Sequence, residues 1–208
     1  MHDSELPFSQ SCENNKGPIL QVLQKHLIPS TDASRQDLRL LEIAGGTGQH
    51  AAYFADQFPF LHWQSSDIPA NKDRLNLRLD AARLSNLPPA ITLDVLQPTW
   101  NVGVFDYVFT ANSLHIMPIE AVHAFFAALP GVLKNGGKLF VYGPFKYGGN
   151  FSTPSNARFD IWLKEQNPVS GIRDFETVCS LASAGGLQLL EDNAMPANNQ
   201  LLVWQKQA

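Results

Sequence analysis

The feature that most constrains the fold is an apolar run that ends in glycines, the stretch LRLLEIAGGTGQH at residues 38–50. Residues 38–43 have the composition of a buried strand, and residues 49–58 carry apolar side chains at helical spacing. A strand, a glycine turn and a helix bring bare backbone N–H groups and a helix N-terminus to one place. Glu42 ends the strand side of this turn, so we expect its carboxylate to reach over the loop.

The turn departs from the common phosphate-binding patterns. A P-loop needs a lysine, which does not follow here, and a dinucleotide fingerprint would need Ala51 as its third small residue. The stretch instead resembles motif I of class I S-adenosylmethionine (SAM) methyltransferases, E-x-G-x-G-x-G. In that family the acidic residue faces the methionine end of the cofactor, and the glycines make room for its ribose and amino acid. A plain strand-turn-helix remains the alternative. The resemblance implies cofactor contacts at Glu42, Ala44 (in place of the first glycine), Gly45, Gly46 and Gly48.

Composition and charge restrict the class of protein. The 208 residues are 44% hydrophobic and 16% charged, which is ordinary for a single globular domain. The net charge is −4 and no lysine or arginine cluster occurs, so we expect no nucleic-acid partner. Cys12, Cys179 and the six histidines show no metal-ligand spacing. We see no signal peptide and no apolar run of about 18 residues, which predicts a cytoplasmic protein without a membrane partner.

Strand-like and helix-like segments alternate along the chain, which predicts an α/β domain with a parallel sheet and a final hairpin. The expected strands cover residues 38–43, 61–67, 91–95, 105–111, 138–142, 187–191 and 201–205. The first expected helix begins at Asn14 or Asn15 and ends before Pro29. The other expected helices cover residues 49–58, 70–85, 118–129, 159–166 and 175–184. We expect one domain over 1–208. Residues 1–30 form an arm and a helix that could cover the site, 30–37 a polar linker, and 144–175 a substrate-side insertion.

Acidic residues end the second and third predicted strands, where ligands bind in open α/β sheets. Asp67 lies 67 − 48 = 19 residues beyond Gly48, a position suited to two hydrogen bonds from a ribose diol. Dehydrogenases share this feature, and a carboxylate that caps the next helix is the alternative. In the methyltransferase pattern Asp94 accepts a hydrogen bond from the adenine amino group and the Val95 N–H binds a ring nitrogen. A simple turn aspartate is the other interpretation.

The fourth predicted strand resembles motif IV of the same methyltransferases, in the stretch FDYVFTAN at residues 105–112. The resemblance places Asn112 at the cofactor, and Asp106 is expected to be structural. His115 follows this strand and is our candidate general base, needed only if the methyl acceptor carries a proton that must leave. A histidine that merely bonds a backbone carbonyl is the alternative.

Several blocks together resemble a narrower group, the methyltransferase-like 26 family of largely uncharacterised bacterial and animal proteins. The blocks lie at residues 7–8, 12–16, 114–118, 142–145, 155–160, 170–175 and 195–199. This resemblance extends from about Pro7 to Trp204. It implies a Rossmann-like class I methyltransferase fold, with a mostly parallel seven-stranded sheet, an antiparallel last strand and helices on both faces. It also implies SAM as cofactor, and it brings no assigned substrate.

Methyl transfer from SAM depends mainly on positioning and on exclusion of water. Loops rich in hydrogen-bonding groups and aromatic residues suit a small polar acceptor in a partly apolar pocket. A structural loop network is the alternative: Arg173 and Asp174 could pair with Asp160 and Arg158, and Asn14 could be a helix N-cap. The candidate acceptor-binding residues are Asn15, Lys16, Tyr142, Asn156, Asp160, Arg173 and Asn199.

We therefore predict a SAM-dependent methyltransferase with a small-molecule acceptor. A nicotinamide-dependent oxidoreductase would need a Tyr-x-x-x-Lys proton donor. Tyr142 and Lys146 have that spacing but flank Gly143 and Pro144, which favour a loop. A catalytically silent SAM-fold module that binds a partner stays open, and the sequence leaves the oligomeric state undefined.

Overall fold

The computed structural model describes residues 6–29 and 38–208. Its internal contacts divide the chain into two compact units. The first unit holds the described residues up to Asp94 together with Phe105–Phe109, and the second holds Val95–Val104 and Thr110–Ala208. The predicted linker at 30–37 lies outside the described residues, and the expectation of a single domain stays a prediction.

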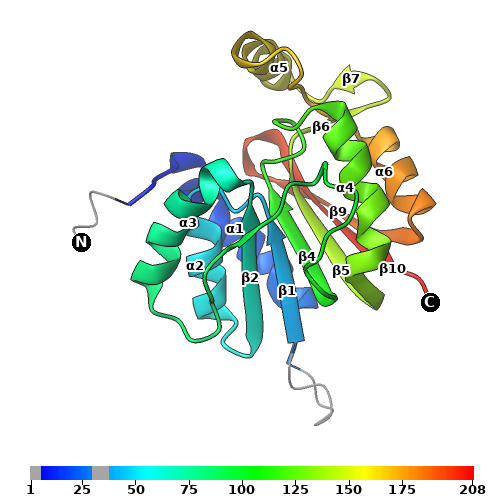
Figure 1. Ribbon diagram of the computed structural model, residues 1–208. Helices are drawn as coiled ribbons and strands as arrows, with labels where there is room; N and C mark the ends of the chain where they lie inside the picture. Colours follow the sequence, from blue (N-terminus) through cyan, green and yellow to red (C-terminus); the bar gives the residue numbers. More distant parts are fainter. Residues whose placement is uncertain (1–5, 30–37) are drawn as a thin grey trace. The chain divides into compact units, whose positions relative to one another are not determined.

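Seven strands form a sheet in the order β3-β2-β1-β4-β5-β10-β9 (Figure 1). Four strands pair in parallel: β1 (Leu38–Ile43), β2 (Leu61–Asp67), β3 (Ile91–Thr92) and β4 (Phe105–Ala111). The second unit adds β5 (Leu133–Gly143), β9 (Leu187–Met195) and β10 (Asn199–Lys206). The last strand, β10, is antiparallel to both of its neighbours, β5 and β9. This confirms the predicted α/β fold with a mostly parallel seven-stranded sheet and an antiparallel last strand.

Three helices belong to the first unit: α1 (Gln10–His26), α2 (Gln49–Gln57) and α3 (Pro69–Ala82). Both α2 and α3 contact β2, and α1 contacts α2. Three buried rings, from Phe54, Trp63 and Phe109, form the centre of this unit, with 5.5 to 5.7 Å between ring centroids. The three rings come from α2, β2 and β4, so they fix the positions of the elements on which the glycine turn is built.

The second unit contains α4 (Ile119–Val132), α5 (Pro154–Gln166) and α6 (Phe175–Ala184). Helices α4 and α6 lie side by side, with α4 in contact with β5 and α6 in contact with β9 (Figure 1). Phe126 packs edge-on against Phe125 at 5.0 Å and against Trp204 at 6.2 Å between ring centroids. The contact between Phe126 and Trp204 joins α4 to β10.

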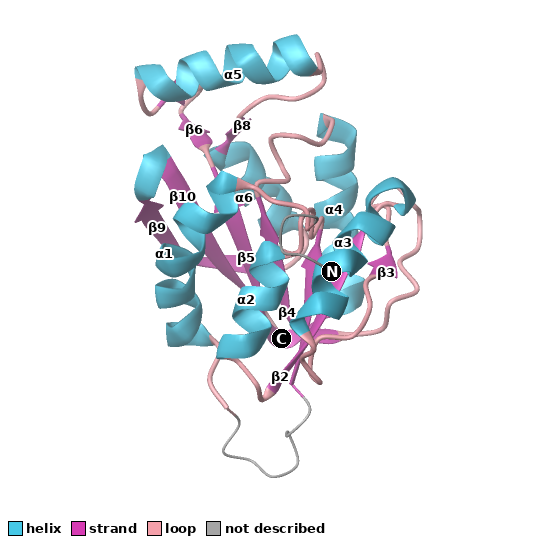
Figure 2. Cartoon of the chain, turned by 90° about the vertical axis from the view of Figure 1, so that its left-hand side faces the viewer, coloured by secondary structure: helices cyan, strands magenta, loops and turns pink. Residues whose placement is uncertain are grey.

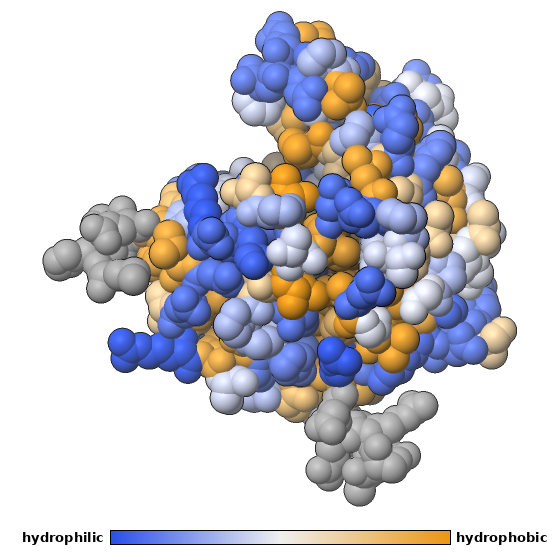
Figure 3. All heavy atoms as spheres, viewed as in Figure 1, coloured by the Kyte–Doolittle hydropathy of each residue, from blue (hydrophilic) through white to orange (hydrophobic). Residues whose placement is uncertain are grey.

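A second, three-stranded sheet lies in the segment expected to be a substrate-side insertion, residues 144–175. It consists of β6 (Phe145–Tyr147), β7 (Asn150–Phe151) and β8 (Arg173–Asp174), in the order β7-β6-β8. Helix α5 connects β7 to β8 and runs above β6 and β8 in Figure 2. Figure 3 shows apolar atoms on the lower side of α5, a helix on which Ile161 and Trp162 are 59% and 51% exposed. A short 3₁₀ turn, η3 (Pro196–Asn198), joins β9 to β10.

Helix α1 begins four residues earlier than the apolar spacing predicts, at Gln10 rather than Asn14. Ser9 is its N-cap residue, so the alternative that Asn14 caps this helix was wrong. The first turn is polar and has no apolar periodicity. Its support is tertiary, because the Ser9 N–H donates to the Gln49 side chain of α2 over 2.5 Å.

Other helix and strand boundaries also differ from the sequence prediction. Helix α5 starts at Pro154, five residues before the prediction, because the Thr153 hydroxyl accepts a hydrogen bond from the Asn156 N–H. Strand β5 starts at Leu133, five residues before the prediction, and its pairing with β10 begins at Lys138. Before that point Gly136 has a φ of 76°, and its carbonyl oxygen accepts a hydrogen bond from the Gln205 side chain. Strand β9 is longer than expected because its pairing with β10 continues through its polar residues, and β3 ends at Thr92.

Within residues 6–29 and 38–208, none of the helices combines the length and apolarity needed to span a membrane.

Phe109→Ala tests the aromatic centre of the first unit. Removal of the fully buried ring leaves a cavity against Phe54 and Trp63. We expect the free energy of unfolding in urea to fall by about 3–5 kcal/mol. Phe151→Ala, at a 37% exposed ring, should change it by less than about 1 kcal/mol. Equal losses for the two variants would show that this cluster does not hold the unit together.

Candidate functional site

The glycine turn joins β1 to α2 and depends on left-handed backbone. Ala44, Gly46 and Gly48 have φ values of 59°, 58° and 73°. A Cβ atom at Gly48 would lie 3.0 Å from Leu75 Cδ1 and 3.2 Å from Arg78 Cβ, both on α3, so no larger residue fits there without movement. Ala44 takes the place of the first glycine of the motif and keeps a conformation that costs a non-glycine residue free energy.

Two hydrogen bonds from the turn go to the end of β2. The Gly45 N–H donates to the Ser66 carbonyl over 3.0 Å, and the Gly46 N–H donates to Asp67 Oδ2 over 2.8 Å. A further bond within the turn runs from the Gly48 N–H to the Gly45 carbonyl over 3.0 Å. The turn is therefore shaped by the neighbouring strand as much as by its own glycines.

Asp67 is buried and its carboxylate is largely engaged. Besides the Gly46 N–H on Oδ2, Oδ1 accepts hydrogen bonds from the Ile68 N–H over 2.8 Å and from Asn71 Nδ2 over 3.0 Å. Ile68 is the N-cap residue of α3, so the alternative interpretation, a carboxylate that stabilises the start of the next helix, agrees with these contacts. A role in ribose binding stays a proposal.

The Glu42 carboxylate lies close to the turn, where a Cβ atom at Gly45 would be 3.4 Å from its Oε2. The side chain is 2% exposed, and its Oε2 accepts hydrogen bonds from Ser65 Oγ and from Trp63 Nε1 over 2.5 and 3.1 Å. Burial raises the pKa of Glu42 to about 7, the two hydrogen bonds lower it, and the nearby Asp67 raises it further. The structure shows no hydrogen bond to the other oxygen, Oε1, from the described residues. The expectation that the carboxylate reaches over the loop stays a prediction.

The N-terminal segment contacts the turn directly, through residues that the sequence did not single out. Gln49 Oε1 accepts hydrogen bonds from the Ser9 N–H and from Thr47 Oγ1, and Gln49 Nε2 donates to Glu13 over 2.7 Å. Arg78 of α3 donates to the carbonyl oxygens of Thr47 and Pro7. A polar residue at the first position of a helix is common, so the sequence carried no signal for the role of Gln49.

Asn15 and Lys16, predicted to bind the acceptor, are occupied by the protein itself. The Asn15 side chain is buried and its Oδ1 lies 2.7 Å from Nε2 of His50 on α2. Lys16 pairs with Glu13 over 2.5 Å and lies 4.9 Å from the centroid of the Tyr53 ring. These contacts agree with a first helix held against α2, whereas the role of residues 1–30 as a lid stays a proposal.

Two further cofactor candidates lie beyond the end of β3. The Leu93 N–H donates to the Asp67 carbonyl over 2.9 Å, and Asp94 follows, partly buried. Val95 is buried and its carbonyl oxygen accepts a hydrogen bond from Trp100 Nε1 over 3.4 Å. The contacts of the described residues do not test the predicted adenine contacts.

Asn112 and His115 follow β4. Asn112 has a φ of 55°, and its N–H donates to the Tyr142 carbonyl over 2.8 Å. His115 is 5% exposed, and its ring packs edge-on against Phe159 at 5.6 Å between centroids. Burial, with a smaller contribution from the Arg173 charge, lowers the pKa of His115 to about 4. No hydrogen bond from a described residue reaches either ring nitrogen, so the alternative of a histidine bonded to a backbone carbonyl is not what the structure shows.

The other acceptor-binding candidates hold loops together. Asn156 Nδ2 donates to Ser152 Oγ and to the Asn198 carbonyl, each over 3.0 Å. Asp160 accepts from the Ile172 N–H over 2.7 Å and from Lys164 over 2.6 Å. The Asn199 side chain donates to the Pro196 carbonyl over 3.3 Å, while Tyr142 is buried and pairs with Leu201 between β5 and β10.

Arg173 does not pair with Asp160 as the structural alternative supposed. Its guanidinium donates to the carbonyl oxygens of Leu114, Met117 and Val169. Asp174 pairs with Lys146 over 3.2 Å, and Asp160 pairs with Lys164. The residue types of a loop network were predicted correctly, but the pairing was wrong.

The described part of the chain contains no group of three or more His, Cys, Asp or Glu side chains arranged to hold a metal ion.

Comparisons with known proteins agree with this fold. The family model described as "Protein of unknown function (DUF938)" matches residues 6–206. The closer resemblance to the methyltransferase-like 26 family is not confirmed by that match.

Solved structures of methyltransferases are similar in fold at low sequence identity. An O-methyltransferase family protein from Burkholderia thailandensis superposes with a TM-score of 0.78 at 18% identity, over 93% of this chain and 56% of that one. An O-methyltransferase family 2 protein from Planctomyces limnophilus, in complex with apigenin, superposes with a TM-score of 0.73 at 14% identity, over 93% of this chain and 62% of that one. PigF with SAH superposes with a TM-score of 0.69 at 15% identity, over 92% of this chain and 58% of that one. The chain therefore spans 56 to 62% of the length of these proteins and has the class I SAM methyltransferase fold.

Glu42→Gln tests the buried carboxylate beside the turn. The pKa of Glu42 is 4.5 in the unfolded chain and about 7 in the folded protein. Above pH 4.5 the unfolded chain therefore loses this proton more readily than the folded protein, and the free energy of unfolding falls. Its contribution to stability is complete below pH 4.5 and is lost as the pH rises through 7. Between pH 5 and pH 8 the wild type should lose about 2 kcal/mol more free energy of unfolding than the variant.

Urea unfolding at both pH values checks this prediction, with the exposed Glu165→Gln as control. The control should follow the wild type. If Glu42→Gln shows the same pH dependence as the wild type, the carboxylate is not buried as described.

Proposed function

The chain belongs to the DUF938 family, whose function is unknown, and we propose that it is a SAM-dependent methyltransferase that acts on a small molecule. The observation that carries this proposal is the turn between β1 and α2. It combines left-handed glycines, a tight approach to α3 at Gly48 and a buried carboxylate at the end of β2. The fold shared with methyltransferases of known structure supports the proposal.

The residues of the turn fit the nucleoside and amino acid of SAM. A Cβ atom at Gly46 would approach only the Ala44 carbonyl oxygen, at 4.0 Å, so the space beside this residue is open, whereas a Cβ atom at Gly45 would lie 3.0 Å from Leu75 Cδ2. Residue 49 opens a helix whose N-terminus favours a carboxylate. Glu42 Oε2 is held by Ser65 and Trp63, so Oε1 remains available for the ammonium group of the methionine moiety. Ala44 lines the same turn in this proposal.

Asp67 fits one ribose hydroxyl as it stands and a second after a small change. A carboxylate has about four acceptor positions, and three donors occupy Asp67. One of the three is the side-chain amide of Asn71, an exposed residue that can rotate toward water. Rotation of Asn71 would free a second position, so both hydroxyls of a ribose diol could bind Asp67. The resemblance adds Asp94, Val95 and Asn112 to the proposed cofactor contacts.

The cofactor, when bound, supplies an electrophilic methyl group on a sulfonium centre. In this proposal, the turn orients the cofactor and the buried side chains near it exclude water. His115 is neutral at pH 7 because its pKa is lowered, so it can accept a hydrogen bond or a proton. A base of such low pKa takes a proton efficiently only from an acidic acceptor group. We therefore assign His115 the orientation of an acceptor hydroxyl, with proton removal limited to acidic hydroxyls such as phenols.

The proposed acceptor is a small molecule. One protein of similar fold was solved in complex with apigenin, which supports this class of acceptor. The polar candidates Asn156, Asp160, Arg173 and Asn199 already bond neighbouring loops, so we expect them to shape the acceptor region rather than to supply most of its hydrogen bonds.

Calorimetric titration with S-adenosylhomocysteine tests the cofactor, with NADH titrated in parallel. We expect micromolar affinity for S-adenosylhomocysteine and no heat of binding for NADH. Asp67→Asn should lower the affinity for S-adenosylhomocysteine tenfold or more, because a charge-assisted hydrogen bond to the ribose is lost. The control is Asp73→Asn, at an exposed position on α3, the helix that follows Asp67. This variant should bind S-adenosylhomocysteine as the wild type does.

Circular dichroism of each variant separates lost binding from lost folding. If NADH binds and S-adenosylhomocysteine does not, the chain is a nicotinamide-dependent protein. If neither ligand binds a folded sample, the methyltransferase proposal is wrong, and a silent module that recognises a partner becomes the better interpretation.

A further inference from the structure

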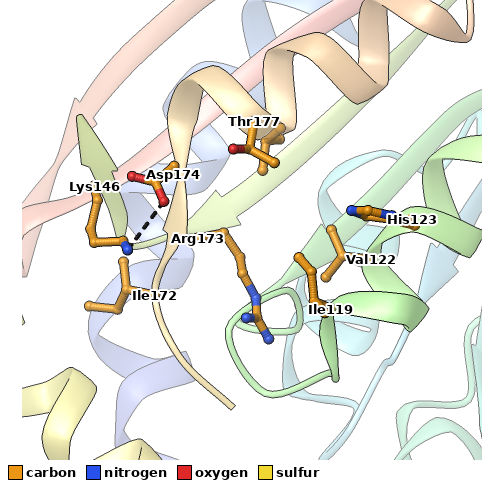
Figure 4. Close-up of a pocket in the computed structure, with 9 residues that line it drawn as sticks. Ile119, Val122, His123, Lys146, Ile172, Arg173, Asp174 and Thr177 are labelled. Carbon is orange, nitrogen blue, oxygen red and sulfur yellow. Dashed lines mark ion pairs between the residues drawn. The ribbon is translucent and has the colours of Figure 1, made fainter. Parts of the chain in front are cut away.

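A cavity of about 290 Å³ lies within the second unit, between α4, β6, β8 and the start of α6 (Figure 4). Its apolar side chains include Val122, Ile172 and Val178, each at most 3% exposed. His123 and Thr177, which also line it, are exposed. The cavity thus has an apolar floor and a polar rim, and its volume is at the small end for ligand sites.

Arg173 brings an unbalanced positive charge to this cavity. Its Nε and Nη2 atoms donate to the carbonyl oxygens of Leu114, Met117 and Val169. Within the described part of the chain no carboxylate lies at ion-pair distance from the guanidinium, and Nη1 has no hydrogen-bond partner. Figure 4 shows the guanidinium projecting from β8 on the side of Ile119. Carbonyl dipoles hold the group in place without neutralising it.

The second cation of the cavity is already neutralised. Lys146 of β6 pairs with Asp174 over 3.2 Å, and both side chains are partly buried (Figure 4). The negative charge of Asp160 raises the pKa of Arg173, although the Asp160 carboxylate is itself paired with Lys164 over 2.6 Å and does not line the cavity. Glu120, an exposed residue at the start of α4, adds a screened negative charge. The charges that line the cavity therefore leave about one positive charge, at Arg173.

Further donors lie at the start of α6, next to the Asp174 carboxylate, whose buried Oδ1 has no hydrogen-bond partner among the described residues. Asp174 is the N-cap residue of α6, and its side chain makes no capping hydrogen bond to the helix. The first N–H groups of a helix lack partners within the helix, and the helix dipole places positive potential there. Thr177 lies in this first turn, lines the cavity, and has a hydroxyl group with no hydrogen-bond partner among the described residues. A guanidinium, a hydroxyl and a helix start are donors suited to an anion.

We infer that this cavity binds a small organic monoanion, an aliphatic carboxylate whose chain lies on Val122, Ile172 and Val178. Its carboxylate would accept hydrogen bonds from Arg173 Nη1 and from the Thr177 hydroxyl. A monoanion matches the single uncompensated charge, whereas a phosphate dianion would meet the carboxylates of Asp174 and Glu120 without enough positive charge. This inference does not rest on the proposed methyltransferase function.

Such a ligand would also touch the group that anchors the segment after β4. Arg173 holds the carbonyl oxygens of Leu114 and Met117, on either side of His115. The Gly171 N–H, two residues before Arg173, donates to the His115 carbonyl over 2.9 Å. Binding at Arg173 is therefore expected to change the environment of the backbone N–H groups at residues 114–117 as well as those at 173–178.

The experiment is a titration of ¹⁵N-labelled protein with butyrate, followed by amide chemical shifts. Matched titrations use butylammonium, 1-butanol and methyl phosphate. Butyrate should give saturable shifts at residues 173–178, with smaller ones at 114–117. Butylammonium and 1-butanol should give none, and methyl phosphate should bind at least tenfold more weakly than butyrate. Tighter binding of methyl phosphate, or equal shifts with butylammonium, would overturn the carboxylate assignment.

Variants locate the site. Arg173→Gln should abolish saturation, but it also removes the anchor of residues 114–117. Thr177→Val keeps that anchor and has nearly the same side-chain shape. It should lower the affinity for butyrate about threefold or more, because one hydrogen bond is lost. Arg158→Gln removes one exposed positive charge elsewhere and should bind butyrate as the wild type does. If Thr177→Val binds like the wild type, or if Arg158→Gln weakens binding as strongly, the cavity is not the carboxylate site.

Discussion

The hydrogen bond from the Gly46 N–H to the Asp67 carboxylate is the contact on which the candidate site depends. It joins the turn after β1 to the last residue of β2, and a second bond, from the Gly45 N–H to the Ser66 carbonyl, lies beside it. Both bonds require the observed register, in which Ile43 lies opposite Ser66. A shift of one residue would move every side chain of β2 to the other face and remove Asp67 from the turn. The shape of the turn is thus a consequence of strand pairing.

The polar end of β2 explains how two carboxylates can be buried so close together. The Ser65 hydroxyl and the Trp63 indole N–H both donate to the Glu42 carboxylate, and the Ser66 hydroxyl donates to the Glu42 carbonyl. These bonds satisfy groups that would otherwise be costly to bury. The raised pKa of Glu42 shows that the compensation is incomplete. A buried acid that reduces stability at neutral pH is commonly found at a functional site, which agrees with the role proposed for this turn.

The sequence was most informative where the backbone itself makes the site. The predicted glycine turn is present, with left-handed conformations at Gly46 and Gly48, and Asp67 lies at the end of the second strand as expected. Side-chain partners were much less predictable. Arg173 donates to three carbonyl oxygens instead of pairing with Asp160, and Lys16 pairs with Glu13 and lies over the Tyr53 ring. Such partners depend on loop conformation and tertiary packing, which leave no periodic pattern in the sequence. The contact between Gln49 and residues 9–13 was missed for the same reason.

Amide spectra of protein labelled with ¹⁵N-glycine test the central claim most directly, because the chain has 14 glycines and three of them lie in the turn. On addition of S-adenosylhomocysteine, we expect large saturable shifts for Gly45, Gly46 and Gly48. Gly136, Gly148 and Gly149 also have positive φ values, but they lie outside the turn and should not move. Saturable shifts elsewhere with the three turn signals unchanged would contradict the claim that this turn holds the nucleoside.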